Sequence, residues 1–224
     1  MTGAPDDLEP ARAGDAATGA ADPDAGADPK LSDELQEWLE GEGDRTLGAL
    51  VDAFGEKSFA ILFVVLLGVP ALPLPTGGAT HVFEVIAVLL AAQLVAGRSA
   101  VWLPQRWLRL ELAGPKQQRF LAGLMRLIRR LERISKPRGR RLFDHRLSQA
   151  VFGLLVILGS VAAFLAPPFT GLDTLPALGV VLIALGVILE DLLIVIVGVI
   201  VGAAGAVLEI VLGTAAVNGI SSLL

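Results

Sequence analysis

The sequence predicts an all-α integral membrane protein with two repeated broken-helix or re-entrant hairpins, a C-terminal spanning helix and amphipathic interfacial helices. Hydrophobic residues make up 54% of the 224 residues, and the mean hydropathy is +0.67. That apolar share is above the usual range of a soluble domain. The apolar residues gather in uncharged blocks, and prolines and glycines interrupt two of these blocks. Together these observations indicate short membrane arms joined by irregular turns.

The first 57 residues are acidic, with 15 Asp or Glu against 4 Lys or Arg. Residues 1–29 are mostly Ala, Asp, Gly and Pro, a composition that buries too little surface to fold, so we expect a disordered acidic tail. Within residues 30–57, two amphipathic helices are expected at the membrane surface, 32–40 with Ser32 as N-cap and 46–54. A short helical hairpin packed on the embedded core is the alternative.

Residues 58–97 form the first membrane unit, in which an apolar arm (59–69), a turn (70–81) and a second arm (82–96) follow one another. At 1.5 Å per residue, an arm of about eleven residues covers roughly half of a ~30 Å hydrocarbon layer. The turn holds three prolines, which a helix interior does not accommodate. We therefore expect a re-entrant hairpin or a pair of broken helices. Its turn lies inside the membrane, where protein covers it or it lines a wet cavity.

Residues 148–191 repeat this pattern, with an arm (151–166), a proline-rich turn (167–176) and a second arm (177–189). Aligning Gly78 with the glycine of the second turn gives an offset of 93 residues. Repeats whose hydrophobic segments are interrupted at matching positions point to a transporter-like site at the repeat interface.

Residues 192–224 contain an apolar run of 21 residues, Leu192 to Leu212, which is long enough to span a membrane. Gly198, Gly202 and Gly205 lie along this run and predict a face for close helix packing.

Residues 98–147 carry 14 of the 18 Lys and Arg residues, and basic connections stay on the cytoplasmic side, so we place this segment in the cytoplasm. An amphipathic helix is expected from Pro115 to Ser135. Its polar face predicts contact with anionic lipid headgroups. Nucleic-acid binding is the weaker alternative, because membrane segments flank the helix. The headgroup-binding candidates are Arg119, Arg126, Arg129, Arg130 and Arg133.

The sequence gives no sign of catalytic chemistry. It has no cysteine and only two histidines, far apart, so thiol chemistry is excluded and a histidine metal cluster is not expected. It has no phosphate-binding loop, nucleophile elbow or zinc motif. We expect no enzyme activity, no metal and no cofactor.

The two turns hold most of the candidate residues for binding a substrate or an ion. If each following arm is a half-helix, its free N–H groups and positive dipole end face the membrane interior and favour an anionic group or counter-ion. For each residue taken singly, helix capping is the alternative. The candidates in and beside the turns are Thr76, Gly77, Gly78, Thr80, Thr170, Gly171, Asp173 and Thr174.

Three further candidates lie on the arm after the first turn. His81 and Glu84 are three residues apart and can share a helix face. An ionisable pair in an apolar arm indicates a functional site that relays protons or holds a cation. The alternative is that the arm starts at the interface and Glu84 lies in water. Gln93 lies on the same face, where it extends a polar track or bridges helices.

Short segments follow one another in a characteristic order. In the first half these are LSDELQEWL, PALPLPTGG (70–78), QLVAGR (93–98) and Trp102–Pro104; in the second half they are PPFTG (167–171), LPAL (175–178) and LGVILED (185–191). In this order the chain resembles the exopolysaccharide synthesis ExoD family over roughly residues 31 to 212. The resemblance implies a bacterial inner-membrane protein linked to exopolysaccharide production, and it implies no reaction.

From these observations we expect a small multi-pass, transporter-like protein of the bacterial inner (cytoplasmic) membrane. It would move an ion or small solute through a site between two broken-helix repeats. A non-transporting scaffold or accessory protein for polysaccharide synthesis is the alternative. The expected partners are the lipid bilayer, anionic headgroups, a second copy in a homodimer and polysaccharide synthesis proteins, but not nucleic acid.

Overall fold

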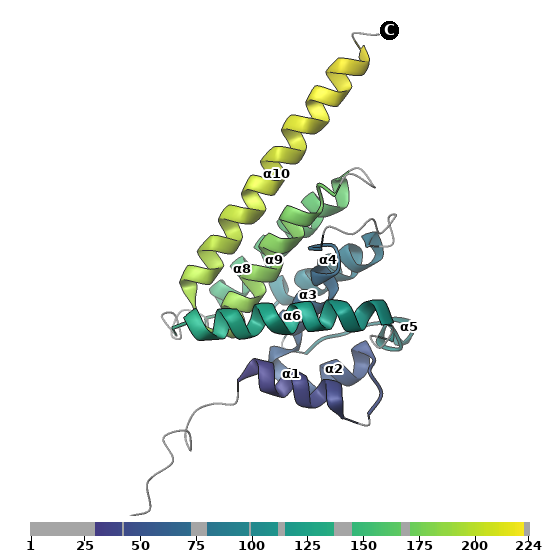
Figure 1. The fold of residues 1–224 in the computed structure, drawn as a ribbon, viewed down its shortest axis with the longest axis vertical. Coiled ribbons are helices and arrows are strands. Elements are labelled where there is room, and N and C mark those ends of the chain that lie inside the picture. Colours follow the sequence, from purple (N-terminus) through teal and green to yellow (C-terminus); the bar gives the residue numbers. More distant parts are fainter. Residues whose placement is uncertain are drawn as a thin grey trace, which may run out of the picture.

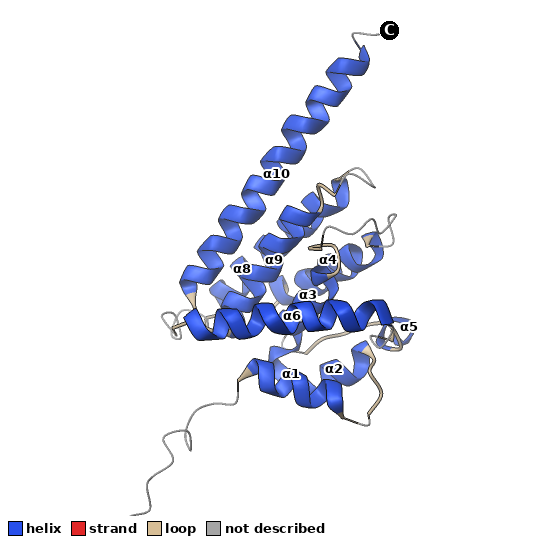
Figure 2. Ribbon diagram, in the orientation of Figure 1, coloured by secondary structure: helices blue, strands red, loops and turns tan. Residues whose placement is uncertain are grey.

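The structure is a computed structural model. It describes residues 30–41, 43–72, 80–98, 100–111, 115–136, 145–166 and 171–221. Within these ranges every regular element is a helix and no strand is formed, which confirms the all-α class (Figure 2). The expected acidic tail, residues 1–29, lies outside the described residues.

The helices follow the predicted blocks closely. Their bounds are α1 Leu31–Glu40, α2 Leu47–Phe54, the 3₁₀ helix η1 Gly55–Lys57, α3 Ser58–Gly68, α4 His81–Val95, α5 Gln105–Leu108, α6 Pro115–Ile134, α8 Arg146–Leu165, α9 Thr174–Ile188 and α10 Leu192–Ser221.

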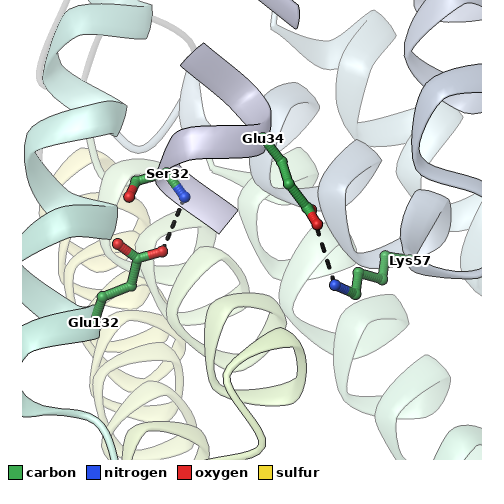
Figure 3. Close-up of polar contacts among 4 residues, drawn as sticks. All are labelled: Ser32, Glu34, Lys57 and Glu132. Atoms are coloured by element: carbon green, nitrogen blue, oxygen red, sulfur yellow. Dashed lines mark hydrogen bonds and ion pairs between the residues drawn. The ribbon is translucent and has the colours of Figure 1, made fainter. Parts of the chain in front are cut away.

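The first helix begins earlier than expected. Its N-cap is Lys30, because the helix extends back to include the buried Leu31, so the prediction of Ser32 as N-cap is wrong. A first-turn amide lacks a partner within its own helix. The Ser32 amide donates instead to Glu132 Oε1 of α6, at 2.9 Å (Figure 3). On the opposite side of α1, Lys57 Nζ lies 3.8 Å from Glu34 Oε2 (Figure 3).

The second helix begins and ends as predicted. Thr46 is its N-cap, and its Oγ1 accepts a hydrogen bond from the Ala49 amide at 3.2 Å. Gly55 follows the helix with φ of +48°, in the left-handed region that glycine adopts at low cost. Leu47 and Leu50 of this helix are buried, as are Leu31 and Leu35 of α1. This burial favours two helices packed on the protein over two helices laid on lipid.

The second arms of the two membrane units have equal length. α4 and α9 each contain 15 residues, and they begin 93 positions apart, at His81 and Thr174. Each ends at a residue with positive φ, Gly97 at +78° and Glu190 at +52°. Each end is also closed by an amide that bonds five residues back, Arg98 to Gln93 at 3.0 Å and Asp191 to Gly186 at 2.9 Å.

The first arms differ from each other in length. α3 has 11 residues, as expected, but α8 has 20 and begins before the expected arm 151–166. The helix extends toward its N-terminus because no proline or glycine separates Arg146 from the apolar run. At about 30 Å, α8 is long and apolar enough to cross a membrane. α3, α4 and α9 are shorter apolar helices.

The predicted glycine face of α10 is confirmed, and it packs against α9. A methyl group added at Gly179 of α9 would lie 2.4 Å from the Gly202 Cα. Methyl groups added to α10 at Gly198 and Gly205 would lie 2.7 Å from the Ile183 amide nitrogen and 2.6 Å from Pro176 Cδ. Only glycine allows backbones to approach so closely.

The hairpin α8–α9 ends well short of the far end of α10 (Figure 1). Gly205, which contacts Leu175 and Pro176 at the start of α9, is the fourteenth of the 30 residues of α10. The rest of α10 extends beyond the hairpin. The start of α9 therefore lies beside the middle of a long apolar helix.

Helix α6 runs across the lower ends of α8, α9 and α10, with α1 and α2 on its other side (Figure 1). Leu124, Met125 and Ile128 of α6 are buried, so protein covers much of the apolar face that was expected to lie on lipid. The end of α6 is attached to the start of α10, because the Lys136 amide donates to Asp191 Oδ2 at 2.9 Å.

The outer faces of the apolar helices are exposed. Two helices, α8 and Leu192–Ala215 of α10, are long and apolar enough to cross a membrane, yet only 28% and 17% of their apolar windows are buried within the protein. A core helix of a soluble protein would be mostly buried. On α8 the exposed apolar residues recur at helical spacing, at Val151, Leu154, Leu158, Val161 and Leu165. These features and this spacing indicate a membrane protein.

Candidate functional site

Four ionisable side chains gather where the hairpins end. His81 and Glu84 lie in the first turn of α4, and Asp173 directly precedes α9. Glu209 comes from α10, one turn beyond the Gly205 contact with α9. We call these four residues the tip cluster. Its first three members lie at the starts of α4 and α9, each of which follows a proline-rich segment of the sequence.

His81 and Glu84 form a direct pair. The His81 Nδ1 and Glu84 Oε2 atoms are 2.7 Å apart. The Glu84 side chain is fully buried, whereas the His81 side chain is 29% exposed. The other carboxyl oxygen, Glu84 Oε1, is buried without a hydrogen-bond partner among the described residues. The sequence alternative that Glu84 lies in water therefore does not hold in this structure.

An aromatic contact joins the two hairpins at this level. The His81 and Phe164 ring centroids are 5.0 Å apart, so the start of α4 touches the end of α8. The other members of the cluster interact with the pair electrostatically. Asp173 interacts with both His81 and Glu84, and Glu209 interacts with both Glu84 and Asp173. Side chains from both units and from α10 thus form one electrostatic group.

Ser160 of α8 adds a neutral polar group. It is fully buried, and its Oγ has no hydrogen-bond partner in the described part of the chain. Its position follows from the register of α8 on α4. Gly153 packs against Ala91 and Val95, and Phe164 packs against His81. Ser160 lies one turn before Phe164 and two turns after Gly153, on the same face and near the level of Glu84.

Polar residues also stand at the starts of α4 and α9. Thr80 and Asp173 are the N-cap residues of α4 and α9, but neither side chain makes the capping hydrogen bond. Thr80 is buried, and Thr174 is the first residue of α9. Gly171 has φ of +68°, so its place in the turn depends on glycine. The candidates Thr76, Gly77, Gly78 and Thr170 lie outside the described residues.

Gln93 does not join the cluster. It lies near the opposite end of α4, where its amide is paired with the backbone of the following loop. Gln93 Nε2 donates to the Trp102 carbonyl at 2.9 Å, and the Trp102 amide donates to Gln93 Oε1 at 2.8 Å. The structure thus gives Gln93 a loop-fixing role at the base of the hairpin.

Sequence reasoning did not select Ser160 or Glu209 as site residues. Glu209 is the one charged residue within the predicted C-terminal span, and that isolation in an apolar run is a usable signal. Ser160 carried no such signal, because an isolated serine in an apolar helix is common. Its place in the site depends on how α8 packs against α4.

The arginine face of α6 is open to solvent. Arg126, Arg129, Arg130 and Arg133 are exposed, and Arg129 also donates to Gln36 Oε1 of α1 at 2.8 Å. The side chain of Arg119 lies outside the described residues. Four of the five predicted headgroup-binding arginines therefore share one accessible surface.

A metal centre is not formed in the described residues. No three His, Asp or Glu side chains there are grouped so that they could hold a metal ion. The tip cluster is a set of interacting ionisable groups with unpaired oxygens, an arrangement suited to holding protons or a loosely bound ion.

The sequence of this chain matches a known protein family. The family model "Exopolysaccharide synthesis, ExoD" matches residues 31–211. An uncharacterized protein of Synechocystis sp. is 34% identical over 192 residues, covering 84% of this chain and 86% of the relative. Protein ExoD of Rhizobium meliloti is 31% identical over 147 residues, covering 65% of this chain and 61% of the relative. No solved structure matches. The chain belongs to the exopolysaccharide synthesis family ExoD.

Proposed function

We propose that this protein is a multi-pass inner-membrane transporter that moves an ion or small solute in support of exopolysaccharide synthesis. The route passes between the two hairpins at the tip cluster, and no covalent chemistry takes place there. The observation that carries the proposal is Glu84, a fully buried carboxyl group in an apolar arm with one oxygen unpaired. Such a group is costly to keep at membrane depth unless it has a function.

The likeness of α4 and α9 supports this proposal. α4 and α9 match in length, in their offset of 93 residues and in the way their ends are closed. Two similar units that meet at their broken ends are the common construction of a midplane binding site. In this proposal the two turns are the re-entrant bends.

The depth of the cluster is the second support. α10 rises about 1.5 Å per residue, so Gly205 lies roughly 20 Å from the start of that helix. A hydrocarbon layer is about 30 Å thick. With the arginine face of α6 at the cytoplasmic surface, the hairpin ends and Glu209 fall inside the layer. The segment 98–147 then stays in the cytoplasm, with its arginines beside anionic headgroups.

A scaffold for polysaccharide synthesis proteins is the second candidate function. The exposed arginines 126, 129, 130 and 133 of α6 favour it, because they offer a broad basic surface to an acidic partner. In this alternative the tip cluster has only a structural role.

Flux measurements on reconstituted protein test the primary proposal. Vesicles with the wild-type protein, with Glu84→Gln and with Glu37→Gln are compared with empty vesicles across a panel of ions and small neutral solutes. Glu37 is an exposed carboxylate on α1, far from the hairpins in sequence, and serves as the control. We expect flux in the wild type and in Glu37→Gln, and a loss of about tenfold or more in Glu84→Gln. Wild-type flux no higher than that of empty vesicles, across the whole panel, would refute transport.

A cellular comparison separates the two functions. If the protein transports, Glu84→Gln lowers exopolysaccharide output while alanine at the four exposed arginines leaves flux in vesicles intact. If it is a scaffold, the arginine variant lowers output and Glu84→Gln does not.

A further inference from the structure

We propose that the tip cluster binds a small monovalent cation in exchange for protons. This inference rests on the proposed transport function, and it specifies the charge of the ion that is transported. Half-helix N-termini by themselves favour an anion. The side chains that the structure brings to those N-termini indicate the opposite charge.

The site holds more acidic than basic side chains. Glu84, Asp173 and Glu209 contribute three carboxyl groups against the single imidazole of His81. The sequence offers nothing to neutralise them, because residues 58–97 and 147–224 contain no Lys or Arg. Carboxylates held away from water must be neutralised by protons or by a bound cation. An anionic substrate would add to the repulsion.

Unpaired oxygens give an independent sign of a ligand. Ser160 is not one of the acidic residues, yet its fully buried Oγ has no partner among the described residues. The register of α8 on α4 places Ser160 on the face toward α4, near the level of Glu84. Glu84 Oε1 and Glu209 Oε1 are likewise buried and unpaired there. Buried polar atoms in native proteins are almost always satisfied, so three unpaired oxygens around one site call for a partner. Oxygens are the ligands that alkali cations and protonated amines accept.

The geometry argues against a tightly held divalent ion. No three of the acidic and histidine side chains in the described ranges converge on one metal position. The site is therefore suited to a weakly held ion that enters and leaves, as transport requires.

The helices around the site contribute only a few titratable groups that could exchange a proton. α4 contributes His81 and Glu84, α9 is preceded by Asp173, and α10 contributes Glu209. α8 contributes the neutral Ser160, and α3 has no titratable side chain. Glu84 is the fully buried carboxyl group, so we assign to it the proton that a cation displaces.

The test uses vesicles that contain a pH-sensitive dye, and the uptake of radiolabelled chloride or sugar is counted in parallel. Wild-type protein, Glu84→Gln, Glu209→Gln, Ser160→Ala and the control Glu37→Gln are reconstituted, and salts are added outside. The cation arms are the chlorides of sodium and potassium. N-methylglucamine chloride, whose cation is bulky, tests for transport of an anion. A neutral sugar tests for transport of an uncharged solute. Entry of a cation in exchange for protons makes the vesicle lumen alkaline.

We expect at least one cation arm to make the lumen alkaline with wild-type protein and with Glu37→Gln. The rate falls about tenfold or more in Glu84→Gln and measurably in Glu209→Gln and Ser160→Ala. Flux that follows chloride or the sugar, with cation arms equal to empty vesicles, would overturn the cation assignment and leave transport standing. No flux in any arm would remove the proposed function itself. A cation response that Glu84→Gln, Glu209→Gln and Ser160→Ala all retain would place the route elsewhere and overturn this inference.

Binding is measured separately, so that the result does not depend on transport. The thermal unfolding midpoint of purified protein is recorded as sodium or potassium replaces N-methylglucamine at constant ionic strength. A bound ligand stabilises the folded state according to its concentration. We expect the midpoint to rise for the wild type and for Glu37→Gln but not for Glu84→Gln. An equal rise in all three proteins would contradict cation binding at Glu84.

Discussion

Helices α4 and α9 have the same length and end in the same way, but they use their buried positions differently. Glu84 in α4 and Ala177 in α9 are equivalent under the offset of 93, and both are fully buried. Glu84 is ionisable and has an oxygen without a hydrogen-bond partner among the described residues, whereas the side chain of Ala177 is only a methyl group. Gln93 in α4 corresponds to Gly186 in α9, which packs against Val195 of α10.

The difference separates two roles within one architecture. α9 carries small residues along the side that faces α10, so the two helices pack backbone to backbone. α4 has no glycine within its bounds and carries the ionisable pair instead. One arm attaches its unit to the long helix, and the other arm carries the polar group of the site.

The largest loss of stability is expected when a carboxyl group is placed on α9, at the position equivalent to Glu84. Ala177→Glu places an ionisable group at a fully buried position of α9. An uncompensated buried charge costs on the order of 3–5 kcal/mol, so we expect loss of folded, monodisperse protein in detergent. Ala53→Glu, at an exposed position of α2, is the control and leaves the elution profile unchanged. A stable Ala177→Glu variant would mean that α9 also tolerates a polar site.

A smaller loss of stability is expected when a methyl group is inserted between α9 and α10. In Gly179→Ala the new carbon would lie 2.4 Å from the Gly202 Cα, a backbone atom that cannot move aside. Overpacking of this kind costs roughly 1–3 kcal/mol, which lowers the thermal unfolding midpoint. Gly213→Ala on α10 has open space around it and serves as the control. Equal midpoints for the two variants would contradict the close approach.

The smallest loss of stability is expected at Gly97, the left-handed residue that follows α4. Gly97→Ala places a side chain on a left-handed residue and costs about 1 kcal/mol, although space is available there. Gly123→Ala in α6, where the space is also open and the backbone is helical, is the control. Equal thermal unfolding midpoints for the two variants would contradict a cost from the left-handed backbone at Gly97.

Much of this fold follows from local signals in the sequence. Thr46 ends up as the N-cap of its helix, and Gly198 and Gly205 meet α9, because capping and close helix packing depend on residue type. The arms begin and end near the expected residues because prolines and glycines interrupt the apolar runs. The start of α8 was missed because no such residue precedes its apolar run.

The rest of the site depends on tertiary packing. Ser160 reaches the level of Glu84 only through the register of α8 on α4, which the contacts of Gly153 and Phe164 set. Glu209 reaches the cluster only because α10 packs closely on α9. Likewise, the apolar face of α6 could not be assigned to protein or lipid until its neighbours were known, since either environment buries it.

The depth of the hairpin ends is the central claim, and nitroxide accessibility measures it most directly. The chain has no cysteine, so a single spin label can be placed at Leu175→Cys at the start of α9, with Leu147→Cys at the start of α8 as reference. In liposomes we predict that the label at 175 collides readily with oxygen and rarely with a water-soluble nickel chelate, and lies deeper than the label at 147. A label at 175 as accessible to nickel as the one at 147 would contradict a hairpin that ends within the bilayer.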